Sequence, residues 1–162
     1  MTMTPAQQMQ STLKSESQIA NEFANLLQVE RQALMDRDET KLNHCLKQKQ
    51  PLVRQLEALG RQRELILKQA GFPADRQGMA AFIANQLPAQ AETLQKMLAS
   101  LKQTAQACQQ NNQINGGIVS VNRQYLQRAM SILRGRDPEA SAYGPGGEYT
   151  SGVVRQPLIG RV

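Results

Sequence analysis

The feature that most constrains this chain is a run of mainly apolar residues spaced alternately four and three positions apart. The run is longest between Leu87 and Leu133, where the spacing continues without a break. An α-helix has about 3.6 residues per turn, so residues at this spacing line one side of it, and we call such a line a seam. No segment alternates with the period of two that a half-buried strand requires. The sequence therefore predicts an all-α fold, an antiparallel helical bundle.

The interruptions between seams predict where the helices begin and end. Thr4 can cap a helix whose first residue is Pro5, and Gly71 with Pro73 beyond it is a typical helix end. We expect the last helix to continue through Gly116 and Gly117, because the seam keeps its phase on both sides. The expected helices cover residues 5–36, 39–70, 74–86 and 88–134, in one helical domain of residues 1–134. Residues 135–162 are rich in Gly, Pro and Ser and are predicted to form a flexible tail.

Four charged residues stand within the first two seams. Glu16 and Glu30 lie in the first seam, and Lys49 and Arg63 lie in the second. The residue numbers of Glu30 and Lys49 have the same sum as those of Glu16 and Arg63, as one antiparallel register would require. We predict that both pairs meet and fix the register of the hairpin. The alternative is that these long side chains reach past the seam edge into water.

The sequence shows no residues arranged for catalysis or for holding a metal or cofactor. His44, the one histidine, is followed by Cys45, but neighbouring helical residues point about 100° apart and cannot chelate together. Cys45 and Cys108 fit as small buried apolar residues of a reduced cytosol. The N-terminus does not resemble a secretory signal, and no stretch approaches the roughly 18 apolar residues of a membrane span. We therefore expect a cytoplasmic protein that is not an enzyme and has no membrane span.

After Gly117 the apolar residues of the last helix spread over more than half of its circumference. A stripe about 100° wide is enough to bury a helix against its neighbours, so the excess predicts a further helical partner. The spread comprises Ile118, Val119, Val121, Tyr125, Leu126, Ala129, Met130, Ile132 and Leu133.

Three asparagines occupy the seam of this helix, at Asn112, Asn115 and Asn122. Buried asparagines in a seam commonly specify register or partner number. They could equally mark the point where the seam leaves the core and meets water or a client protein. The second interpretation is the favoured one.

Four stretches together resemble a known family. They are Leu26-Leu27-x-x-Glu30-x-x-x-Leu34; Asp38-x-x-x-Leu42 with Lys49 and Leu52 downstream; Asn112-x-x-Asn115-Gly116; and Tyr143-Gly144-Pro145-Gly146-Gly147. In this order and spacing they are similar to the FlgN family, the flagellar type III export chaperones for hook-associated proteins. Two features depart from the family pattern: Pro51 interrupts the second helix, and the sequence after Glu148 is longer than expected.

The resemblance implies a client and a docking site. The client would be the amphipathic C-terminal helix of a hook-associated protein, kept from polymerising and delivered to the export gate. The resemblance places export-gate docking at Tyr143, Gly144 and Gly147. The client-binding residues that it implies are Ile118, Val121, Tyr125, Leu126, Met130, Ile132 and Leu133.

Two alternatives remain open. The apolar face could meet its own copy, which would make the chain a self-associating coiled-coil adaptor and a homodimer. Residues 37–71 carry eight basic and four acidic groups, a balance that could also suit a basic helical nucleic-acid-binding protein. Such a protein would bind more weakly as salt rises. We expect no nucleic-acid partner, because these charges alternate in sign and lack interleaved aromatics.

Overall fold

Four helices make up the part of the chain that the structure, a computed structural model, describes, which is residues 2–133. Their order and bounds are α1 (Pro5–Asp36), α2 (Glu39–Gln69), α3 (Arg76–Ala84) and α4 (Pro88–Leu133). The all-α prediction is confirmed, with no strand among the described residues. The predicted α3 was too long, because Asp75 caps the helix from outside and Asn85 already ends it.

The chain divides into two compact units within α4. One unit covers residues 1–115, and the other begins at Gly116. The helix itself continues through Gly116 and Gly117, as the unbroken seam predicts.

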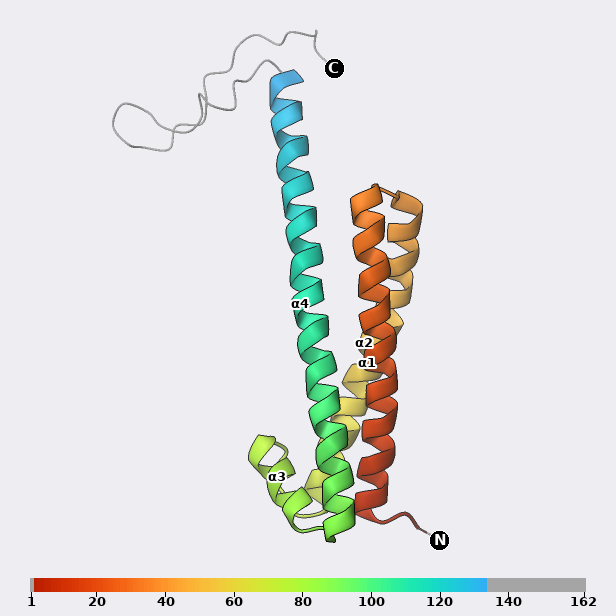
Figure 1. Ribbon diagram of the computed structural model, residues 1–162, viewed down its shortest axis with the longest axis vertical. Helices are drawn as coiled ribbons and strands as arrows, with labels where there is room; N and C mark the ends of the chain where they lie inside the picture. The colour runs from red at the N-terminus through yellow and green to blue at the C-terminus, as the bar shows by residue number, and fades with distance from the viewer. Residues whose placement is uncertain (1, 134–162) are drawn as a thin grey trace, which may run out of the picture. The chain divides into compact units, whose positions relative to one another are not determined.

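α1 and α2 form an antiparallel hairpin whose ends are set by local hydrogen bonds (Figure 1). At the start of α1, the Thr4 hydroxyl accepts from the Gln7 amide, while the Gln7 side chain accepts from the Thr4 amide. At its end, Arg37 adopts a left-handed conformation with φ 56°, which turns the chain. Asp38 then caps α2 through the Lys41 amide. A two-residue connection therefore suffices, and it forces the two helices side by side.

The interruption expected at Pro51 is not observed, because α2 continues through this residue. The helix ends where the glycine signal predicts. Gly71 has a φ of 83°, a conformation that a residue with a side chain rarely adopts. The Phe72 amide donates to the Leu67 carbonyl, which satisfies one of the last carbonyls of the helix.

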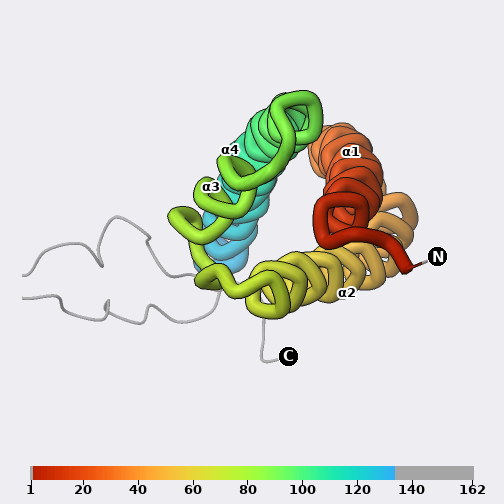
Figure 2. Tube along the Cα trace, turned by 90° about the horizontal axis from the view of Figure 1, so that it is seen from below, coloured from red at the N-terminus to blue at the C-terminus, as the bar shows by residue number. Residues whose placement is uncertain are grey.

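Within residues 1–115 the three long helices surround a mainly aliphatic core. Figure 2 shows the backbones of these helices seen along the bundle. α3 connects the end of α2 to the start of α4 and adds Met79, Phe82 and Ile83 to this core, all three buried as predicted. The Phe72 ring meets the Phe82 ring edge to face, with centroids 5.6 Å apart. The core cluster consists of Met9, Leu13, Ala20, Ile66, Leu67, Met79, Phe82, Ile83, Leu94 and Leu101.

None of the helices described is long and apolar enough to cross a membrane.

Gly78 is the position where α3 tolerates no side chain. A Cβ built there would lie 1.8 Å from the carbonyl oxygen of Pro73. We expect Gly78→Ala to lower the free energy of unfolding by about 1–3 kcal/mol, because the loop before α3 has to move. Chemical denaturation of the full chain measures this loss.

Gly60 provides the matched control. It lies inside α2, and an added Cβ would have no neighbour within 4 Å. Gly60→Ala should raise the free energy of unfolding by about 0.5–1 kcal/mol through helix propensity alone. If the two substitutions changed the free energy of unfolding by the same amount, the result would contradict the close contact between Gly78 and Pro73.

Candidate functional site

The largest group of exposed apolar side chains on one element lies on α4 after Gly117. Tyr125 and Leu126 expose 65% and 64% of their surface, and Ile132 and Leu133 expose more than half. Val121 and Met130 are also exposed, whereas Ile118 is half-buried. Val119, part of the predicted apolar spread, is exposed to 50% as well.

These side chains form two adjacent lines on the helix. With about 100° between successive residues, Ile118, Val121, Tyr125 and Ile132 fall on one line, and Val119, Leu126, Met130 and Leu133 fall on the next. Together they span about half of the helix surface, and we call this set the α4 apolar face. An apolar band of this width is more than a solvated helix needs, so it is a candidate site for a second helix.

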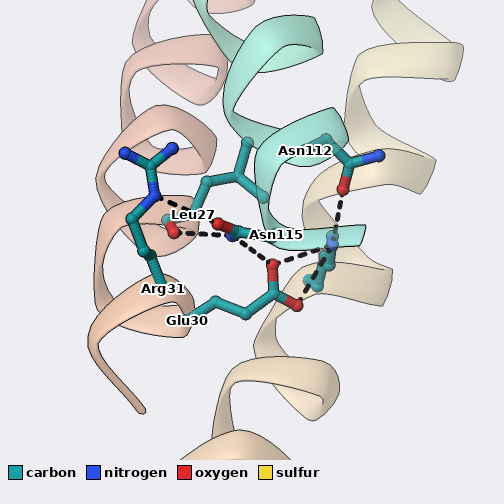
Figure 3. A network of polar contacts seen from close by, with 6 residues as sticks. Leu27, Glu30, Arg31, Asn112 and Asn115 are labelled. Carbon is teal, nitrogen blue, oxygen red and sulfur yellow. Dashed lines mark hydrogen bonds and ion pairs between the residues drawn. The ribbon is translucent and has the colours of Figure 1, made fainter. Parts of the chain in front are cut away.

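Immediately before this face, a polar network joins α1, α2 and α4 (Figure 3). Asn115 is only 3% exposed, and its amide nitrogen donates to the Leu27 carbonyl at 2.9 Å and to Glu30 Oε2 at 2.8 Å. Arg31 Nε donates to the Asn115 oxygen at 3.3 Å. Lys49 Nζ from α2 reaches Glu30 Oε1 at 3.2 Å and donates to Asn112 at 2.9 Å. Every polar atom of the Asn115 amide group therefore has a partner, as a buried amide requires.

This network bears on both interpretations of the asparagines. Asn115 is buried and bonded to α1, and it is the last fully buried member of the seam, so the seam leaves the core directly after it. Asn112 is exposed, yet its oxygen is held by Lys49. Both residues act within the bundle, which is the register-setting interpretation. Asn122 lies beyond Gly116 and is half-buried.

Comparison with known proteins gives a family for this arrangement. The family model described as FlgN protein matches residues 1–151. The chain belongs to the FlgN family. It is also similar to the crystal structure of a flagella synthesis protein FlgN from Pseudomonas aeruginosa, with 34% identity and a TM-score of 0.64. That match covers 74% of this chain and 90% of the other. No curated protein sequence matches the chain.

FlgN proteins are chaperones of flagellar export rather than enzymes, so a flagellar export chaperone role follows from membership. The structure explains part of the resemblance physically. Glu30, Lys49, Asn112 and Asn115 come from three of the four stretches that resemble the family, and all four meet in one network. These four residues therefore connect α1, α2 and α4.

In the second ion pair of the hairpin, Glu16–Arg63, the carboxylate is more buried than in the first. Arg63 approaches Glu16 Oε2 at 3.4 Å, so both predicted pairs, Glu30–Lys49 and Glu16–Arg63, are formed. Glu16 is only 8% exposed, and its Oε2 accepts no hydrogen bond from the described residues. Burial raises the pKa of the Glu16 carboxyl above its ordinary value of 4.5, and the Arg63 charge lowers this pKa only in part.

The remaining candidate chemical groups are structural. Cys45 and Cys108 are buried, and burial raises the pKa of both thiols, which favours their protonated form. His44 is exposed, and the described residues contain no group of three or more side chains that could hold a metal. The predicted gate-docking residues Tyr143, Gly144 and Gly147 lie outside the described residues.

Asn115→Ala tests the network. The substitution removes the donor to Leu27 and Glu30, so we expect a loss of about 1–3 kcal/mol in the free energy of unfolding. Gln113→Ala, at an exposed position two residues earlier, should change it by less than about 0.5 kcal/mol. Equal losses in the two variants, measured by urea denaturation, would contradict the role assigned to Asn115.

Glu16→Gln tests the buried carboxyl through pH. The folded chain keeps the Glu16 proton to a higher pH than the unfolded chain, so this group contributes stability that is lost as pH rises from about 4.5 through the raised pKa. The free energy of unfolding of the unmodified chain, minus that of Glu16→Gln, should therefore fall over this range. Denaturation at a series of pH values measures the difference, and a rise with pH would show that the pKa is lowered instead.

Proposed function

We propose that this chain is a cytoplasmic chaperone that binds the amphipathic C-terminal helices of hook-associated proteins through its α4 apolar face. It keeps these helices from polymerising and delivers them to the flagellar export gate. The observation that carries the proposal is the exposure of the face on residues 118–133, in a chain of the FlgN family.

The physical basis is association of one helix with the side of another. Leu126 and Leu133 lie seven residues apart on the same line of the face, and Met130 stands four residues after Leu126. A client helix would place its own apolar residues between these side chains. The client must become ordered on binding, so the affinity is moderate and the complex can be released. We assign the gate contact to Tyr143 with Gly144 and Gly147.

The α4 apolar face also suits a second candidate, self-association. Two copies of the face could bury each other, and the chain would then be a homodimeric adaptor. The competing occupants differ in one measurable respect: a homodimer would form without any client and would compete with client binding.

The deciding experiment is calorimetric titration with a peptide of the C-terminal helix of a hook-associated protein. We expect Leu126→Asp combined with Met130→Asp to weaken binding about a hundredfold, since two anchors at about 1.4 kcal/mol each are lost. Circular dichroism should show that the helices remain. Binding should change little between low and high salt, because apolar contacts release few counterions.

The matched control substitutes two exposed leucines of α2, Leu46→Asp with Leu65→Asp. This variant carries the same added charge and should bind the peptide as the unmodified chain does. An equal loss in the control would mean that charge, and not the α4 apolar face, is responsible. Absence of binding by the unmodified chain, together with a dimer in sedimentation equilibrium, would favour the adaptor.

A further inference from the structure

Residues 1–115 contain an open apolar cleft, separate from the α4 apolar face. Its volume is about 690 Å³, and all four helices contribute to its lining. Phe23, Leu56 and Leu98 line it and are only half-buried, and Ala105 lines it and is exposed. The cleft is therefore a mainly apolar surface open to solvent, and four members of the core cluster form part of its lining: Ala20, Leu67, Met79 and Leu101.

Small side chains leave this space unfilled. Ala20 from α1 and Ala105 and Cys108 from α4 stand where larger residues would otherwise meet. A helix about 10 Å across that rises about 1.5 Å per residue occupies roughly 120 Å³ per residue. The cleft thus has the volume of roughly six helical residues, enough for a short segment to fill it.

A polar group in the lining points to what such a segment must carry. Glu16 lines the cleft, is more than nine-tenths buried, and leaves its Oε2 without a hydrogen-bond donor. Arg63 approaches this oxygen only at 3.4 Å. A buried acceptor without a donor is unfavourable, and a donor from an occupant would satisfy it. Two other acidic residues line the cleft: Asp75 already accepts from the Gly78 amide, and Glu64 is exposed to solvent, unlike Glu16.

We propose that this cleft binds a short apolar segment of a partner polypeptide, about six residues long, that brings one hydrogen-bond donor to Glu16. The inference rests on the proposed chaperone function for the identity of the partner, an export client. It adds a second place of contact, in which a client would be held by a short segment in the cleft and by a helix on the α4 apolar face.

The experiment uses the full chain and a synthetic probe, an acetylated and amidated peptide of four leucines around one lysine, titrated by calorimetry. Ala105→Trp fills the cleft, and we expect it to weaken binding at least tenfold. Ala107→Trp adds the same side chain to α4 at an exposed position outside the lining, and binding should stay unchanged. A probe with norleucine in place of the lysine should bind the unmodified chain more weakly than the lysine probe does. The affinity of the norleucine probe should be the same for Glu16→Gln as for the unmodified chain.

Several outcomes would overturn the proposal. These are no binding of the lysine probe to the unmodified chain, equal loss in the two tryptophan variants, or no difference between the lysine and norleucine probes. A dimer of the unmodified chain that becomes monomeric in Ala105→Trp would identify a second copy as the occupant instead. Leu126→Asp with Met130→Asp should leave the probe's affinity intact. Failure of the cleft is thereby distinguished from failure of the proposed client-helix site.

Discussion

The buried amide of Asn115 is the contact on which the organisation of this chain depends. It bonds α4 to the backbone of α1 at Leu27 and to Glu30, which in turn holds Lys49 of α2. Residues seven positions apart on α4 are buried up to this point: Leu94, Leu101, Cys108 and then Asn115. The next members of the series are Asn122, half-buried, and Ala129, exposed. The polar network is thus the last buried layer of α4.

A polar group in that last layer has a physical advantage over an apolar one. An apolar contact at this level would be non-directional, whereas a hydrogen bond requires its partner at one position. The amide must find both a carbonyl and a carboxylate, and a shifted helix would leave these groups unpaired. The Glu30–Lys49 pair applies the same restriction to α2. Register is therefore specified among all three long helices at one level of the bundle.

Much of the fold follows from local rules in the sequence. Thr4 and Pro5, the turn at Arg37 and Asp38, and Gly71 fix the helix ends within one or two residues, because caps depend on nearby atoms only. The hairpin register followed from the spacing of Glu16, Glu30, Lys49 and Arg63, because an antiparallel pair of helices leaves one free parameter. The exposed α4 apolar face followed from the width of its apolar band.

What the sequence did not reveal depends on contacts between distant residues. The burial of Asn115 requires knowing that the Leu27 carbonyl stands opposite, 88 residues away. The close approach of Gly78 to Pro73 and the cleft at Ala105 are also consequences of how helices pack, and alanine or glycine in a helix gives no separate signal for either. Resemblance to the FlgN family indicated that Asn112 and Asn115 matter without indicating that their role is structural.

The separation of the core from the α4 apolar face has a consequence for how such a chaperone can work. The core cluster lies entirely within residues 1–115, so folding of that unit is driven by side chains outside the α4 apolar face. Residues 118–133 are then free to keep an apolar face that would be buried in an ordinary helix. Its exposure costs solubility, which the net charge of +6 helps to maintain. Because folding and the proposed client binding use different parts of one helix, substitutions on the α4 apolar face should leave the stability of residues 1–115 unchanged.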